Sequence, residues 1–392
     1  MRRTEWLQET RMARFEEAYG GWTESRLTQA EAARLLGVCD RTFRRWLDRY
    51  QDEGMEGLLD KRLVQGSGRC APVDEVLALV DRYRHGHRGW NVKHFYAWYR
   101  RDGGGRSYTW VKNKLQAAGL VTRAPRRGAH RKRREASPWP GMLLHQDGSR
   151  HEWVPGQMWD LIVTMDDATN EHYSMFFCAE EGTWSSFRGV REVLARKGVF
   201  CSLYTDRGSH YWHTPVAGGK VDKRTPTQFG RAMAQLGIEM IPAYSPEARG
   251  RSERAFRTHQ DRLGKELAAA GITDMTRANA YIRHHYLPAF NAEFARPSRE
   301  AGSAFVAGPD SGRLDEILCE QHERRVGHDN CVRFQGRVLQ LPPDRYRCHY
   351  VKANVTVLHH PDGWLAIRHG PRELARYDVS GKPLKEASKA AA

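Results

Sequence analysis

The chain has 392 residues, a formal net charge of +16 at pH 7 and a sequence pI of about 9.7. This positive charge favours a polyanionic partner such as nucleic acid over a neutral one. Its seven scattered cysteines lack paired spacing, which argues against a zinc site and predicts reduced thiols, and no run approaches the roughly 18 apolar residues of a membrane span.

The N-terminal region carries the pattern of a helix-turn-helix. Thr28 and Glu31 form a capping-box signature at the start of one helix, and Gly37-Val38 supplies a tight turn. Asp40 is the expected cap of a second helix, whose apolar positions recur at helical spacing up to Tyr50. Arginines give this second helix a basic outer face: Arg41, Arg44, Arg45 and Arg49. We expect the helix to bind the major groove of DNA; the alternative is an ordinary helical hairpin with solvated arginines.

A second helical unit and a basic linker follow. Residues 72–122 predict another three-helix, helix-turn-helix-like unit, with Asn91 as the cap of its middle helix. Residues 123–138 are too basic to bury themselves and are expected to follow DNA phosphates, although a solvated charge run is the alternative. The expected DNA-binding residues of this linker are Arg131, Lys132, Arg133 and Arg134.

The pattern changes to a mixed α/β domain over residues 139–300. Three short strands within 142–178 are followed by alternating helices and strands up to a helix over 249–269. This order implies a mixed sheet covered by helices. A further helix over 281–294 carries Pro288, where we expect a kink.

The predicted architecture is therefore a multidomain α/β protein, at roughly 100–200 residues per domain. Short strands separated by turns after residue 325 predict a small C-terminal β-barrel. The predicted segments are a helix-turn-helix domain at 1–65, a second such domain at 72–122, a basic linker at 123–138, the α/β core at 139–300 and the β domain at 325–380.

Three acidic residues give the α/β core its expected chemistry. Asp147 and Asp206 each end a predicted strand, 59 positions apart, and neighbouring strands of a mixed sheet can present both at one edge. Glu253 lies near the start of a helix. Like charges this close raise one another's pKa unless a divalent cation relieves them. We therefore expect these three residues to be catalytic ligands of two Mg²⁺ ions, or of Mn²⁺, which would act on a phosphodiester.

Several nearby residues have open roles. Glu247 is a rival carboxylate, and Asp166 and Asp167 are alternative ligands that fit better in a turn between two strands. His145 and His210 flank the predicted site and are candidates for proton transfer or phosphate binding, with a structural role as the alternative. Basic residues of the 249–269 helix are expected to bind the DNA backbone, or else to form surface i,i+4 pairs: Arg251, Arg254 and Arg257.

Three segments resemble the catalytic motifs of a known superfamily. They are His145-Gln146-Asp147-Gly148-Ser149, Tyr204-Thr205-Asp206-Arg207-Gly208-Ser209-His210, and Ser245-Pro246 through Gly250-Arg251-Ser252-Glu253-Arg254. They resemble the motifs of insertion-sequence transposases in the retroviral-integrase superfamily, most nearly the ISNCY type. The resemblance covers most of the chain. It implies a ribonuclease-H-like core with Asp147, Asp206 and Glu253 as the Asp-Asp-Glu metal ligands.

The chain departs from the superfamily pattern at two points. The interval from Asp206 to Glu253 is longer than usual, and the surplus lies in a loop-like insertion around Trp212 to Lys220. The His/Cys zinc domain of retroviral integrases is not present in the sequence.

The resemblance implies a DNA transposase. Such an enzyme cleaves DNA at the ends of a mobile element and joins the freed 3′ hydroxyl to target DNA. Its expected partners are double-stranded DNA, at the element ends and at the target, and further copies of the same chain, with no membrane partner. We expect it to act in the cytoplasm, associated with the nucleoid. Two other classes stay open: a sequence-specific DNA-binding regulator with an inert core, and a ribonuclease-H-like nuclease that acts on RNA or hybrids.

Overall fold

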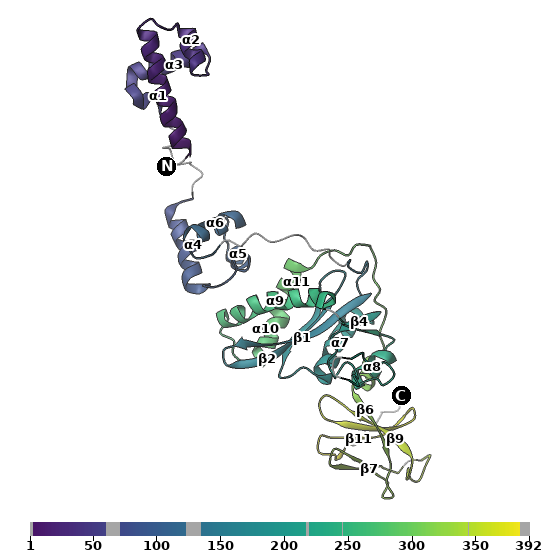
Figure 1. Ribbon diagram of the computed structural model, residues 1–392. Helices are drawn as coiled ribbons and strands as arrows, with labels where there is room; N and C mark the ends of the chain where they lie inside the picture. Colours follow the sequence, from purple (N-terminus) through teal and green to yellow (C-terminus); the bar gives the residue numbers. More distant parts are fainter. Residues whose placement is uncertain are drawn as a thin grey trace, which may run out of the picture. The chain divides into compact units, whose positions relative to one another are not determined.

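The computed structural model describes most of the chain (Figure 1). The described residues are 3–59, 71–122, 135–216, 219–244, 246–343 and 345–384. Residues 123–134 of the expected basic linker lie outside them, including the four expected DNA-binding residues, Arg131, Lys132, Arg133 and Arg134. The chain divides into two compact units, Met1–Arg82 and Tyr83–Ala392.

The first unit contains the helix-turn-helix that the sequence predicts. Its helices are α1 (Arg3–Thr23), α2 (Gln29–Leu35) and α3 (Asp40–Glu53), followed by a 3₁₀ turn at Gly54–Leu58. The capping box is confirmed, because the Glu31 N–H donates to Thr28 Oγ1 and the Thr28 N–H donates to Glu31 Oε2. The cap of α3 is Cys39, not Asp40: Cys39 has extended backbone angles, and Asp40 is already the first helical residue.

Three short helices follow in the order expected from the sequence. They are α4 (Val73–Gly86), α5 (Val92–Arg101) and α6 (Tyr108–Ala117). Asn91 caps α5 as predicted, since its side chain accepts a hydrogen bond from the His94 N–H at 2.8 Å.

A five-stranded mixed sheet forms the centre of the second unit. Its strands are β1 (Leu143–Val154), β2 (Gln157–Asp166), β3 (His172–Cys178), β4 (Ser202–Thr205) and β5 (Glu239–Pro242). Their order is β3-β2-β1-β4-β5, in which the first three pair antiparallel and β1, β4 and β5 pair parallel. This is the ribonuclease-H-like arrangement that the motif resemblance implied.

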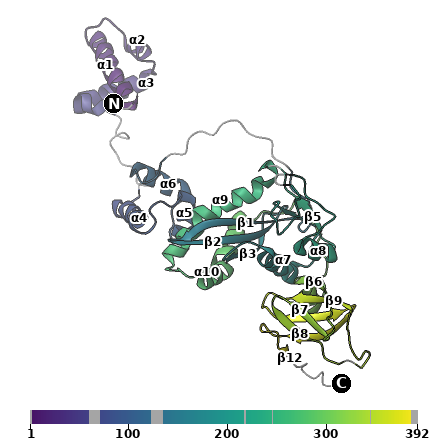
Figure 2. The same ribbon diagram turned by 60° about the horizontal axis from the view of Figure 1, so that its bottom comes forward.

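Helices cover both faces of this sheet (Figures 1 and 2). One face packs against α7 (Thr183–Lys197) and α8 (Gln228–Gln235) around Leu144, Phe187 and Phe229. The other packs against α9 (Pro246–Ala269), α10 (Met275–Tyr281) and α11 (Leu287–Phe294), in a cluster that includes Trp153, Phe177 and Leu263. The site lies at an edge of this three-layer core.

The expected helix over 281–294 is part of a longer helical run that begins at Met275. A π-helical turn, Ile282–Tyr286, separates α10 from α11, and Pro288 lies in the first turn of α11. Proline has no N–H and fits the first turn of a helix, so the irregularity falls just before it.

The C-terminal segment is rich in strands, as predicted, but the predicted barrel is not found in its described residues. After α12 (Ser311–Ile317), its strands are β6 (Glu320–Arg325), β7 (Cys331–Phe334), β8 (Arg337–Gln340), β9 (Asn354–His359), β10 (Leu365–His369), β11 (Arg372–Tyr377) and β12 (Pro383–Leu384). Within the described residues, the strands pair as a five-stranded sheet, β12-β11-β10-β9-β6, and a β7-β8 hairpin. In those same residues, no helix is long and apolar enough to cross a membrane.

Candidate active site

The strand register brings the segments that carry Asp147 and Asp206 next to each other. Residues of β1 pair with residues of the parallel strand β4 that lie 59 positions later, as in Leu143 with Ser202 and His145 with Tyr204. Asp147 and Asp206 are separated by the same 59 positions. Asp206 follows the last residue of β4 and therefore continues this register. Neighbouring strands lie roughly 4.8 Å apart, so the two carboxylates are at one level of the sheet.

Both aspartates belong to the sheet face that α9 covers. Side chains alternate between the two faces of a strand. Ser149 accepts a hydrogen bond from Gln260 of α9, and His145 shares the Asp167 carboxylate with Arg251 of α9. Asp147 lies between these two residues and therefore belongs to that face by alternation. The ring of Tyr204 lies 5.3 Å from the ring of His145, so Asp206 belongs to the same face. The helix that carries Glu253 therefore lies over the two aspartates.

The position of Glu253 on α9 follows from two contacts further along the helix. Gln260 Nε2 donates to Ser149 Oγ at 3.0 Å, and a Cβ atom at Gly264 would be 3.1 Å from the Trp153 carbonyl oxygen. Glu253 precedes these residues by 7 and 11 positions, so it lies on the same helical stripe. At about 1.5 Å per residue, Glu253 is about 10 Å before Gln260, near the level of Asp147. Its side chain is exposed.

The carboxylates accept local hydrogen bonds instead of converging. Asp147, 7% exposed, accepts from the Gly148 N–H at 3.1 Å, and Asp206 accepts from the Gly208 N–H at 2.8 Å. Within the described ranges, no three His, Cys, Asp or Glu side chains come close enough together to hold a metal ion. The donor chemistry nevertheless fits hard divalent cations, which prefer carboxylate oxygens.

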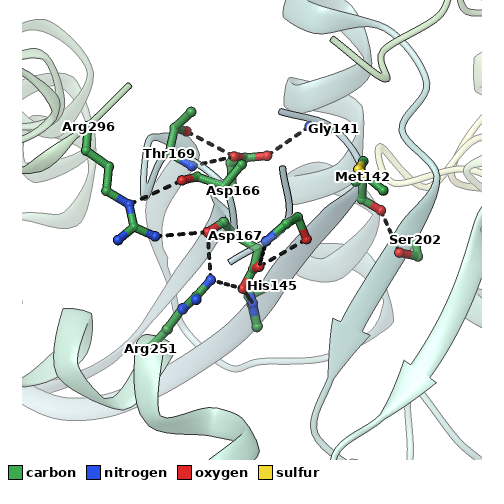
Figure 3. A network of polar contacts seen from close by, with 11 residues as sticks. Gly141, Met142, His145, Asp166, Asp167, Thr169, Ser202, Arg251 and Arg296 are labelled. Atoms are coloured by element: carbon green, nitrogen blue, oxygen red, sulfur yellow. Dashed lines mark hydrogen bonds and ion pairs between the residues drawn. The ribbon is translucent and has the colours of Figure 1, made fainter. Parts of the chain in front are cut away.

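Asp166 is the last residue of β2 and Asp167 is the first residue of the turn that follows, close to the turn position that the sequence favoured (Figure 3). Asp166 accepts from the Gly141 N–H at 2.9 Å and from the Thr169 N–H at 2.8 Å. These contacts connect the turn to the start of β1. The turn therefore shapes the core, and its carboxylates are engaged in protein hydrogen bonds.

Asp167 is the centre of a buried polar network (Figure 3). Its carboxylate accepts from His145 Nε2 at 2.9 Å, from the Ser137 N–H at 2.7 Å and from the guanidinium of Arg251. Burial alone would raise the pKa of this carboxyl, but the hydrogen bonds from His145 and Ser137 and the charge of Arg251 outweigh it and hold the pKa well below its usual range. Asp167 is therefore ionised at neutral pH, and His145 has a partner inside the core.

Sequence reasoning missed Glu181, which lies beside the aspartates. A Cβ atom at Gly148 would be only 2.1 Å from Glu181 Oε2, and His210 Nε2 lies 3.6 Å from Glu181 Oε1. Glu181 Oε1 and His210 Nε2 are both buried, and among the described residues neither atom has a hydrogen-bond partner. Glu181 stands in the loop before α7, where its N–H donates to Asp160 Oδ2 at 2.7 Å. This contact between distant segments has no signal in the sequence.

The expected DNA-binding residues fall into two groups. Arg251 is mostly buried and donates to Asp167, so it faces the core. The other described arginines are exposed: Arg41, Arg44, Arg45 and Arg49 on α3, and Arg254 and Arg257 on α9. Glu247 lies in the first turn of α9, where the side chain is outside the described part of the structure.

Known proteins match parts of this chain. Residues 18–71 match the family described as winged helix-turn-helix. Among solved structures, a simian T-cell lymphotropic virus intasome aligns with 76% of this chain and 95% of its own, at 14% identity and a TM-score of 0.33. The integrase catalytic core domain of HTLV-2 in complex with magnesium aligns with 37% of this chain and 85% of its own, at 14% identity and a TM-score of 0.29.

Two curated relatives are transposases. The transposase for insertion sequence IS1202 of Streptococcus pneumoniae is 29% identical over 204 residues, which cover 52% of this chain and 43% of that protein. The putative transposase y4bF of Sinorhizobium fredii (strain NBRC 101917 / NGR234) is 31% identical over 358 residues, which cover 88% of this chain and 76% of the relative. This similarity extends over most of both chains, and the protein also has a helix-turn-helix and a ribonuclease-H-like core. The protein therefore belongs to the family of DNA transposases that includes y4bF.

Proposed function

We propose that the protein cleaves DNA at the ends of a mobile element and joins those ends to target DNA, with Asp147, Asp206 and Glu253 as its catalytic residues. The observation that carries the proposal is the parallel pairing of β1 with β4, in which His145 pairs with Tyr204, two residues before Asp147 and Asp206 respectively. Glu253 lies on the helical stripe that faces β1, and its exposed side chain can rotate toward the two aspartates.

These three carboxylates would hold two Mg²⁺ ions, with Mn²⁺ as a substitute, because their oxygen donors suit hard divalent cations. When bound, the cations would activate the attacking oxygen and stabilise the leaving oxygen of the phosphodiester. The carboxylates themselves position the site and form no covalent bond to DNA. Glu253 completes it only after its side chain turns inward, which links assembly of the site to substrate binding.

DNA would be bound by exposed arginines on two elements. The α3 arginines contact the element ends, and Arg254 and Arg257 on α9 contact the backbone beside the site. The linker residues Arg131, Lys132, Arg133 and Arg134 would add phosphate contacts between the two elements. Two DNA ends must be bridged for joining, so the active form would be an oligomer of this chain at the nucleoid.

The test is a strand-transfer assay with the Asp206→Asn variant. Loss of a ligand that serves the transition state should lower the rate about a thousandfold, since several kcal/mol are involved and each 1.36 kcal/mol is tenfold. Binding to element-end DNA should be unchanged, and the exposed Asp362→Asn variant should behave as the native protein. Strand transfer at the native rate by Asp206→Asn would remove the assignment. Binding without metal-dependent cleavage by the native protein would favour the regulator.

A further inference from the structure

The Asp167 network joins the two segments that carry the proposed catalytic residues (Figure 3). His145 and Arg251 both donate to Asp167 Oδ1. His145 lies two residues before Asp147 on β1, and Arg251 lies two residues before Glu253 on α9. One buried oxygen atom therefore connects the strand of the first carboxylate to the helix of the third.

The same carboxylate also holds the chain that leads out of the basic linker. Its second oxygen, Oδ2, accepts from the N–H and the hydroxyl of Ser137, at 2.7 and 3.0 Å. Arg251 additionally donates to the backbone carbonyl of Asp167. We call the four side chains Ser137, His145, Asp167 and Arg251 the Asp167 clasp.

The clasp connects the start of α9 to the sheet side of the core through Arg251. The buried apolar side chains of α9 among the described residues are Phe256, Leu263 and Leu267, all beyond Glu253. Arg251 is therefore a side-chain anchor toward the sheet on the N-terminal side of Glu253, beside the buried Ser252, among the α9 side chains that the structure describes. Asp167 is 0% exposed, so its contact with Arg251 is shielded from solvent screening.

We propose that Asp167 is a positioning residue, which acts through Arg251 to fix the first turns of α9 and hence the approach of Glu253 to Asp147. The link to catalysis rests on the proposed function, but the attachment of α9 does not. In metal sites, outer partners of this kind orient the ligands, and their loss typically costs 10–100-fold in metal affinity or activity.

Hydrogen–deuterium exchange of the metal-free protein tests the attachment. In the Arg251→Gln variant, amides of residues 250–257 should exchange at least about tenfold faster. The contact between Arg251 and Asp167 is absent from this variant, so local opening of the first turns of α9 costs less free energy. Amides of residues 260–267 should be unchanged, since apolar packing holds them. The matched control is Arg283→Gln, which replaces an exposed arginine of the π-helical turn. Equal exchange of residues 250–257 in the two variants would overturn the inference.

Strand transfer and Mn²⁺ affinity test the consequence for the site. Arg251→Gln should lower both by about 10–100-fold without loss of DNA binding. Arg251→Lys retains a charged donor and should recover part of each. Asp167→Asn should match Arg251→Gln in both readouts, because it removes the ionised acceptor. Variants are compared at a temperature where circular dichroism shows the native helix content.

The two proposals fail in different ways. If Asp206→Asn abolishes strand transfer while Arg251→Gln and Arg251→Lys act as the native protein, the clasp does not position Glu253 and the proposed function stands. If the native protein has no metal-dependent activity but residues 250–257 lose protection in Arg251→Gln, the proposed function fails and the attachment stands.

Discussion

Two buried histidines should make the core sensitive to acid. His172 on β3 and His259 on α9 face each other between the sheet and its helices, with their Nε2 atoms 3.0 Å apart. Burial lowers the pKa of His172 to about 4 and holds the pKa of His259 well below its ordinary value. Both rings are therefore neutral in the folded protein at pH 7.

The sign and size of the effect follow from proton linkage. Below about pH 6.5 the unfolded chain binds protons that the folded chain does not, so stability is lost as the pH falls toward the folded-state value. For His172, the difference between about 6.5 and about 4 corresponds to about 3 kcal/mol, at 1.36 kcal/mol per pH unit. His172 is 2% exposed, so solvent screening does not reduce this figure appreciably.

Urea unfolding followed by tryptophan fluorescence, at steps from pH 7.5 to 4, measures this loss. Over that range the native protein should lose about 3 kcal/mol more than His172→Gln, which has no ring to protonate. His284→Gln replaces an exposed histidine and should follow the native curve. An unfolding free energy that falls as steeply with pH in His172→Gln as in the native protein would refute the reasoning.

Three further predictions concern other parts of the chain. Arg44→Gln on α3 should weaken binding to element-end DNA and reduce the slope of log affinity against log salt by about 0.9, as for one lost phosphate contact; an unchanged slope in a salt titration would argue against that contact. Gly148→Ala should cost about 1–3 kcal/mol of unfolding free energy, because its Cβ would be 2.1 Å from Glu181 Oε2; urea unfolding without a shift would show that Glu181 moves freely. Glu266→Gln should cost about 1–3 kcal/mol by the same measurement, because Glu266 is a buried acceptor for His94 at 2.7 Å and Tyr281 at 2.8 Å; the native unfolding midpoint would contradict this.

Strands and helix caps could be predicted from the sequence where they depend on residues that are close together in the chain. The apolar pattern of β3 and the caps Thr28 and Asn91 depend on residues a few positions apart, and each was predicted correctly. The end of β1 was not predicted correctly. The apolar pattern stops at Asp147, but pairing with β2 continues the strand to Val154. Backbone hydrogen bonds to a neighbouring strand do not require apolar side chains, so the sequence gives no sign of the extension.

In the candidate site too, some features could be predicted from the sequence and others depend on contacts between distant segments. The 59-position spacing of Asp147 and Asp206 predicted neighbouring strands, and the observed register agrees. The role of Asp167 was out of reach, because its partner Arg251 is 84 positions away and the sequence suggested a DNA contact for that arginine. Glu181 was equally hidden, since its place beside Gly148 depends on how the loop before α7 folds over the sheet edge.

The central claim is that the carboxylates of Asp147 and Asp206, with Glu253, bind divalent cations. Anomalous diffraction from crystals of the protein with Mn²⁺ and element-end DNA tests it most directly. We predict anomalous peaks within coordination distance of Asp147 and Asp206, with the Glu253 side chain turned toward them. Peaks that lie away from both aspartates, in a complex that carries out strand transfer in the crystal, would contradict the account.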